Sequence, residues 1–172
     1  MSRDDRVPVH VLLNGAERTL DVQMHDSLLD ALREAGLVGA KRACETSDCG
    51  ACAVLLDGKL VNSCSTLALQ AEGRRIETIE ALGRREALHP LQEAFLAHAA
   101  VQCGFCIPGM ILTMHALLER RPDASLAEIR DALTLCRCTG YTKPIAAVLE
   151  YQRALLAARG ATASPDGSTE AP

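Results

Sequence analysis

The sequence predicts an α+β protein whose first half combines strands with a helix and whose second half is helical. Two observations predict this division. Over residues 7–80, apolar residues alternate in short runs separated by Asn14-Gly15 and Asp57-Gly58, dipeptides typical of tight hairpin turns. From His89 onward, apolar residues recur at the spacing of a helix with one buried face.

The elements expected in the first half are short and have recognisable boundaries. Asp26 or Ser27 can cap the start of a helix, and Gly36 can end it in the left-handed conformation. The expected elements are a hairpin over residues 9–22, a helix over 26–36, a second hairpin over 53–61 and a strand over 76–79.

The second half contains residues typical of the starts and ends of consecutive helices. Pro122 stops one helix, and the spacing of Ser125 and Glu128 is that of a capping box that opens the next. Pro144 suits the first turn of the last helix. Helices are expected at residues 91–96, 110–118, 125–133 and 144–158.

These elements divide into two expected domains, residues 1–82 and residues 83–159. Domains of this size are near the lower limit for a self-sufficient hydrophobic core, so a metal centre in each would help to hold its loops. Residues 160–172 are rich in Ala, Ser, Thr, Gly and Pro, and this tail is expected to be disordered because it has little to bury.

Composition excludes several classes of function. A formal net charge of −4 argues against nucleic-acid binding, which usually needs a basic face. No run of about 18 apolar residues is present, so no membrane span is expected. The polar N-terminus lacks the apolar segment of a secretory signal, which favours the cytoplasm. Thiols stay reduced there, so eight cysteines indicate metal binding or redox work rather than disulfides.

The first four cysteines have the spacing of a plant-type [2Fe–2S] ferredoxin. Three lie within nine residues at intervals of four and two, and eleven residues separate the third from the fourth. A loop of this length can surround a flat Fe₂S₂ unit, and Gly50 would let the backbone approach the sulfide with a positive φ. The expected ligands are Cys44, Cys49, Cys52 and Cys64.

A zinc site is the alternative for this first set. Zinc favours two CxxC pairs around one ion, and only Cys49 and Cys52 have that spacing, so iron–sulfur is favoured. Lys41 and Arg42 lie just upstream and would either offset the negative charge of a cluster or remain solvated surface charges; the sequence supports both interpretations.

The second set comprises the pairs Cys103/Cys106 and Cys136/Cys138, each placed at a helix junction. Helix N-termini favour thiolates through their free N–H groups, so the two pairs can meet around one metal centre. A thioredoxin-like dithiol is disfavoured because no βαβ pattern surrounds the first pair. Spacing predicts a metal here but leaves open whether it is zinc or an iron–sulfur cluster.

Three segments, in this order, resemble the iron–sulfur subunit of molybdenum hydroxylases, the xanthine oxidase family that includes aerobic carbon monoxide dehydrogenase and 4-hydroxybenzoyl-CoA reductase. The resemblance covers residues 7–152. Two positions depart from the usual pattern, with Ala43 in place of glycine and Leu133-Thr134 in place of Gly-Asn. The segments are CETSDCGACAVLLDG at 44–58, QCGFCIPGM at 102–110 and LCRCTGY at 135–141.

The resemblance implies a β-grasp ferredoxin domain followed by a four-helix domain, with a [2Fe–2S] cluster on each cysteine set. It implies an electron-transfer subunit of an oxidoreductase whose catalytic molybdenum site is on a partner. Electrons would pass from the molybdopterin of a large subunit through the second cluster and then the first to the FAD of a medium subunit. A dimer of such heterotrimers is one arrangement. Gln102 would hydrogen-bond the pterin, and Cys138 would approach it.

Two other functions remain as alternatives. A free-standing ferredoxin would need only the first domain, and the second cysteine set argues against it. A structural zinc protein would be colourless, whereas an iron–sulfur protein is red-brown. The five histidines do not cluster at ligand spacing, so histidine ligation is not expected.

Overall fold

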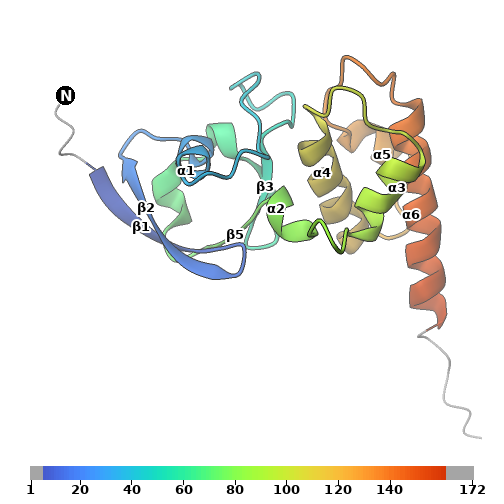
Figure 1. Ribbon diagram of the computed structural model, residues 1–172, viewed down its shortest axis with the longest axis horizontal. Coiled ribbons are helices and arrows are strands. Elements are labelled where there is room, and N and C mark those ends of the chain that lie inside the picture. Colours follow the sequence, from blue (N-terminus) through green and yellow to red (C-terminus); the bar gives the residue numbers. More distant parts are fainter. Residues whose placement is uncertain (1–5, 162–172) are drawn as a thin grey trace, which may run out of the picture.

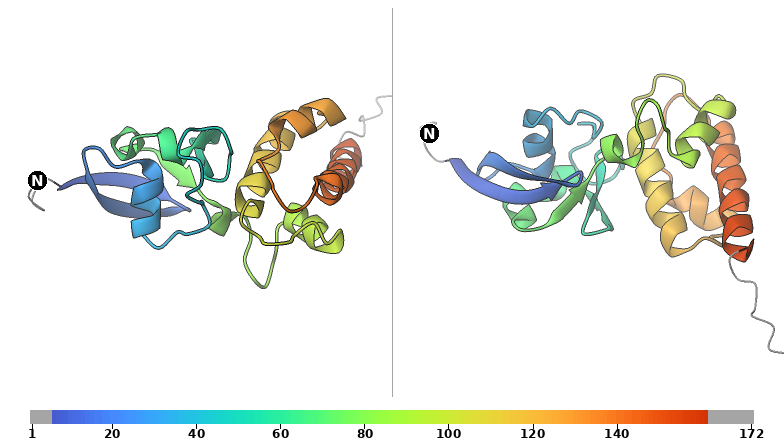
Figure 2. Two further views of the ribbon diagram at one scale, coloured as in Figure 1. Left: turned by 90° about the horizontal axis from the view of Figure 1, so that it is seen from above. Right: turned by 60° about the horizontal axis from the view of Figure 1, so that its bottom comes forward.

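The computed structural model describes the chain from residue 6 to residue 161. Within this range the chain forms one five-stranded sheet and six α-helices, which agrees with the α+β class expected from the sequence. Figures 1 and 2 show the sheet and the last four helices as two lobes lying side by side. We call residues 6–77 the sheet half and residues 90–161 the helical half.

The sheet is built from the two expected hairpins. Asn14 and Gly15 in the first turn, and Asp57 and Gly58 in the second, all have positive φ, as tight hairpin turns require. The strand order is β2-β1-β5-β3-β4, with β1 and β5 parallel and the other neighbours antiparallel. The strands are β1 (Arg6–Leu13), β2 (Ala16–Gln23), β3 (Ala53–Leu56), β4 (Lys59–Asn62) and β5 (Arg75–Glu77).

Helix α1 (Leu28–Glu34) packs its apolar residues into the core of the sheet half. Ser27 is the N-cap residue: its hydroxyl accepts the Asp30 N–H at 3.1 Å, and the Asp30 carboxylate accepts the Ser27 N–H in return. Gly36, with φ +85°, follows the end of the helix as expected. Both ends of α1 are therefore set by residues adjacent to it in the sequence.

The strand expected over residues 76–79 ends earlier than predicted. Thr78 exchanges two hydrogen bonds with Asn14, from the Thr78 N–H to Oδ1 and from the Asn14 amide to Oγ1, each 2.9 Å. This pairing ends β5 at Glu77, and the short helix α2 (Ile79–Leu82) begins at Ile79. The prediction that Ile79 closes a strand is therefore wrong.

In the helical half, α4 lies against the sheet half, and α6 lies on the side of the helical half that faces away from the sheet (Figures 1 and 2). Leu112 and Ala116 of α4 share a small buried cluster with Leu55 of β3. His89 and Ser125 are the N-cap residues of α3 and α5. The helices are α3 (Pro90–Ala97), α4 (Ile107–Arg120), α5 (Leu126–Ala132) and α6 (Thr142–Ala161).

The expected disordered tail began at residue 160. Residues 160 and 161 still belong to α6, and the rest of the tail lies outside the described residues. Across the described part of the chain, none of the helices has the length and apolar character needed to cross a membrane.

Candidate metal centres

The loop between α1 and β3 carries three of the first four cysteines, and the short 3₁₀ helix η1 (Ser63–Ser65) carries the fourth, Cys64. The loop lies at the edge of the sheet half nearest α4 (Figure 1). Its backbone turns back repeatedly, with positive φ at Glu45, Ser47 and Gly50. Gly50 has φ +73°, as expected for a close backbone approach between two ligands.

Hydrogen bonds and burial give the thiols of the first set unequal acidities. The Cys44 Sγ accepts the N–H groups of Thr46 and Cys49, each at 3.5 Å, and these bonds lower the pKa of Cys44 to about 6. Burial raises the pKa of Cys52 to about 11, because it disfavours the charged thiolate. A bound metal would favour the thiolate form of both cysteines.

The two cations just before Cys44 are paired with groups of the protein. Arg42 forms ion pairs with Asp30 and Glu45, and the Lys41 Nζ donates to the Val38 carbonyl at 2.6 Å. Arg42 thus connects α1 with the cysteine loop through Asp30 and Glu45, and both interpretations of Lys41 and Arg42 are compatible with these contacts.

The second set of cysteines meets where the start of α4 approaches the loop before α6. The Sγ atoms of Cys103 and Cys138 lie 3.5 Å apart, and the thiols of Cys106 and Cys136 contact each other. Cys106 is the N-cap residue of α4 and is buried. The four residues therefore form two pairs, one exposed and one largely enclosed.

The pKa values of the enclosed pair differ widely. Burial raises the pKa of Cys106 to about 12. Burial also opposes the ionisation of Cys136, but the Thr139 hydroxyl at 3.2 Å and its N–H at 3.4 Å donate to the Cys136 Sγ and lower its pKa to about 7. Contact with Cys103 raises the pKa of Cys138. Cys136 is thus more readily deprotonated to bind a metal than Cys106 or Cys138.

The pairing fits a two-metal cluster better than a single ion. Four ligands of one zinc ion surround a common point, with sulfurs about 4 Å from one another. Among the described residues, no three potential ligands converge in that way. In a [2Fe–2S] cluster each iron takes two thiolates, which matches the pairs Cys103/Cys138 and Cys106/Cys136.

The two cysteine sets lie on either side of one contact between the halves. The Leu135 N–H donates to the Cys49 carbonyl at 2.9 Å. Leu135 precedes Cys136 of the second set, so this bond connects the second set to a cysteine of the first. Gly109 faces the same loop, where an added Cβ would stand 2.4 Å from the Gly50 carbonyl oxygen. This contact was not predicted, because no local pattern links Gly109 to Gly50.

Tyr141 and Thr139 also organise the second set. The Cys136 N–H donates to the Tyr141 hydroxyl at 2.7 Å, and the Tyr141 N–H donates to the Thr139 hydroxyl at 3.2 Å. Thr139 and Tyr141 were not expected as site residues. Their signal in the sequence is that both belong to the LCRCTGY segment at 135–141, which carries part of the family resemblance.

Gln102, the expected pterin contact, is exposed next to the exposed Cys103. Apolar side chains flank the same surface, with Phe105 45% exposed and Leu135 61% exposed. Leu135 also lines a pocket of about 630 Å³ between α5 and the start of α6, together with Leu133, Tyr141 and Ile145. The second set thus has two exposed apolar side chains beside it in the sequence, Phe105 and Leu135.

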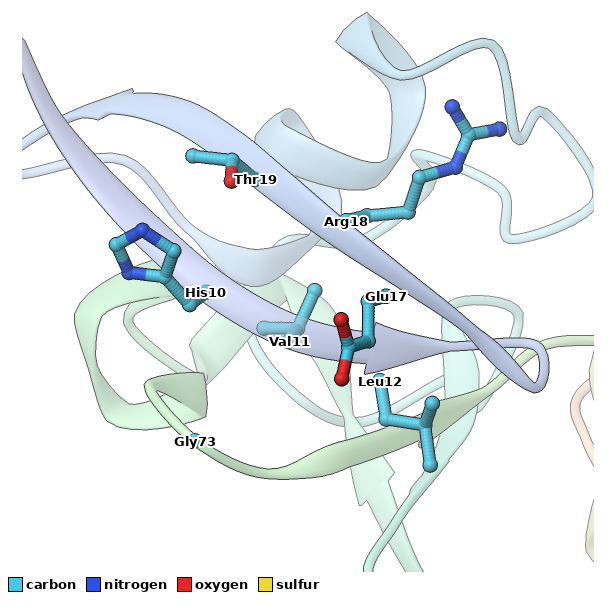
Figure 3. Close-up of a pocket in the computed structure, with 7 residues that line it drawn as sticks. All are labelled: His10, Val11, Leu12, Glu17, Arg18, Thr19 and Gly73. Carbon is cyan, nitrogen blue, oxygen red and sulfur yellow. The ribbon is translucent and has the colours of Figure 1, made fainter.

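A second pocket of about 630 Å³ lies away from the cysteines, on the outer side of the first hairpin (Figure 3). It is lined by side chains of β1 and β2 and by Gly73. His10 at this pocket contacts the Glu72 carboxylate through its ring and its N–H, and no cysteine lines the pocket. The cavity therefore has no part in the two cysteine sites.

Two family models match the chain in sequence order. A "2Fe-2S iron-sulfur cluster binding domain" matches residues 11–81, and a "[2Fe-2S] binding domain" matches residues 78–149. Each match contains one complete set of four cysteines.

Similar proteins cover nearly the same extent of chain. The nicotine 6-hydroxylase small subunit of Paenarthrobacter nicotinovorans is 47% identical over 87% of this chain and 92% of its own. The nicotinate dehydrogenase small FeS subunit of Eubacterium barkeri is 44% identical over 84% and 94%. A chain of the crystal structure of quinoline 2-oxidoreductase from Pseudomonas putida 86 superposes with a TM-score of 0.84 at 43% identity, covering 91% of this chain and 99% of that one.

Proposed function

The chain belongs to the family of small iron–sulfur subunits of molybdenum hydroxylases, and from this premise we propose which residues hold its clusters and which partner each cluster faces. It is an electron-transfer subunit of an oxidoreductase, with two [2Fe–2S] centres. When bound, the clusters take up and release single electrons between a molybdopterin and an FAD.

Cys44, Cys49, Cys52 and Cys64 are assigned to the first cluster, and Cys103, Cys106, Cys136 and Cys138 to the second. The observation that carries the assignment is the grouping of the second set into two thiol pairs, which suits two irons, and in the first set Cys52 and Cys64 form one such pair. Donors already directed at sulfur, such as Thr139 at Cys136 and the loop N–H groups at Cys44, support it further.

We place the second cluster beside the molybdopterin of a large subunit. Gln102, Cys103 and Cys138 are exposed there, and Phe105 and Leu135 offer apolar surface for a partner to cover. In this arrangement Gln102 hydrogen-bonds the pterin and Cys138 approaches it.

The first cluster then faces the FAD of a medium subunit, and the assembly doubles as a dimer of heterotrimers. Residues 1–82 form a β-grasp domain and residues 83–159 a four-helix domain, joined at the Cys49–Leu135 contact. Strand β1 pairs antiparallel with β2 and parallel with β5, and α1 packs into the core beside the sheet. This arrangement supports the assignment of a β-grasp domain.

Metal analysis of the purified chain tests the ligand assignment. We expect about four iron atoms per chain and, after reduction, two distinguishable [2Fe–2S] EPR signals, because two sets of four thiolates each hold two irons. Stoichiometric zinc with no such signals would refute the assignment.

Native mass measurement tests whether the chain belongs to a complex with large and medium subunits. A monomer that reduces many acceptors without a large partner would indicate a free-standing ferredoxin instead.

Gln102→Ala tests which cluster faces the molybdopterin. In the assembled complex we expect reduction of the clusters by substrate to slow about tenfold, the effect of losing one good hydrogen bond. Iron content and the rate of reoxidation should stay at the wild-type values. Arg18→Ala, on the far side of the sheet half, is the control and should change neither rate. Slower reoxidation with unchanged reduction would place Gln102 on the flavin side.

A further inference from the structure

Thr134 brings a hydroxyl group into the contact between the two halves. The residue is only 3% exposed, and its Oγ1 has no hydrogen-bond partner among the residues that the structure describes. Buried polar atoms are nearly always paired, because leaving one unpaired costs folding free energy. The position therefore points to a partner that the polypeptide does not itself supply.

The surroundings of Thr134 identify the direction of this hydroxyl. The chain is extended after α5, Leu133 packs against the helical core, and Leu135 is exposed. Thr134 faces the first cysteine loop, with its Oγ1 3.2 Å from the point that a Cβ on Gly50 would occupy. Gly50 lies between Cys49 and Cys52, so the hydroxyl adjoins the segment that carries two ligands of the first cluster.

The nearby carbonyl groups of this loop already accept hydrogen bonds. The Cys49 carbonyl accepts the Leu135 N–H at 2.9 Å, and the Gly50 carbonyl accepts the Ala53 N–H at 3.2 Å. The sulfur atoms of a cluster held by this loop are good acceptors for a hydroxyl donor. Gly50 has no side chain, so the Thr134 hydroxyl lies directly against the backbone of the loop that carries Cys49 and Cys52.

We propose that the Thr134 hydroxyl donates a hydrogen bond to a sulfur of the first cluster and so raises the reduction potential of that cluster. The proposal rests on the ligand assignment given under the proposed function. Reduction adds negative charge to the cluster, and a hydrogen-bond donor stabilises the reduced form more than the oxidised form. A residue two positions before Cys136 in the second set would thus tune the first cluster.

Redox titration of the reconstituted full-length chain, followed by EPR, tests the proposal. Thr134→Val removes the donor and keeps the side-chain shape. We expect the ratio of reduced to oxidised first cluster at a fixed potential to fall about tenfold, a shift of about 59 mV to lower potential. Thr134→Ser keeps the hydroxyl and should leave the potential close to wild type. The potential of the second cluster should not move in either variant.

Thr113→Val is the matched control, since Thr113 is a buried threonine of α4 about two helical turns beyond Cys106. It should shift neither potential. An unchanged first cluster in Thr134→Val, a shift confined to the second cluster, or equal shifts in the Val and Ser variants would each overturn the proposal. Absence of both iron–sulfur signals from the wild type would instead refute the ligand assignment.

A second measurement keeps the proposal testable should Thr134→Val fail to take up iron. Pulsed EPR of the wild type in H₂O and D₂O detects exchangeable protons coupled to each cluster. We expect Thr134→Ser to retain every exchangeable proton seen at the first cluster. The Thr134→Ala variant should lack one of them, and an unchanged set in that variant would overturn the proposal.

Discussion

Gly109→Ala is expected to destabilise the protein by about 2–3 kcal/mol and to loosen the first cysteine loop. An added Cβ would stand 2.4 Å from the Gly50 carbonyl oxygen and 3.1 Å from the Ala51 Cα, and both are backbone atoms that cannot rotate away. Overpacking of this kind typically costs about 1–3 kcal/mol. Either α4 or the loop must move, and the Leu135–Cys49 hydrogen bond beside them would lengthen.

The expected loss of stability in Gly109→Ala is opposite in sign to the usual effect of this substitution in a helix. At an ordinary helix position, glycine to alanine stabilises by about 1 kcal/mol because alanine has the higher helix propensity. Thermal unfolding should instead show a midpoint lowered by about 5–10 °C for a chain of this size, with reduced occupancy of the first cluster.

Gly73→Ala provides the control for this comparison. Gly73 has φ +68° but no atom within 4 Å of an added Cβ, so only backbone strain of about 1 kcal/mol is expected, with both clusters intact. A Gly109→Ala protein as stable as the wild type, with normal iron content, would contradict the close contact between the halves.

Local chemistry explains how much of the fold could be predicted from the sequence. Both hairpin turns and the caps at Ser27 and Ser125 depend on a few adjacent residues, and the structure contains all of them. Ile79 was misassigned because β5 is ended by Asn14, more than sixty residues away. A strand boundary set by a distant partner leaves no signal in the neighbouring sequence.

The same distinction applies to the candidate sites. The spacing of Cys44, Cys49 and Cys52 is a local property of one loop, so the ligands could be proposed from the sequence. The pairing of Cys103 with Cys138 depends on how α4 meets the loop before α6, and no spacing specifies it. Thr134 has a role only because the two halves pack together, and its own sequence neighbourhood belongs to the second set.

Cys52→Ala is expected to abolish the first cluster while the second remains. Cys52 is only 2% exposed and lies where the loop enters β3, within the core of the sheet half. Three remaining thiolates leave one iron incompletely ligated, so iron should fall from about four atoms to about two per chain. The loop loses its metal anchor, and the sheet half should unfold at lower temperature than the wild type. Metal analysis and EPR of the reduced protein measure both effects.

Cys106→Ala is the reciprocal variant, because Cys106 is also buried, at 5% exposure, but belongs to the core of the helical half. It should remove the other EPR signal and the same amount of iron. The hydrogen bond between Leu135 and Cys49 connects the two sites, so small changes in the shape of the surviving signal are compatible with the assignment. If either substitution removed both signals, or if both substitutions removed the same one, the division of the eight cysteines into two sets would be wrong.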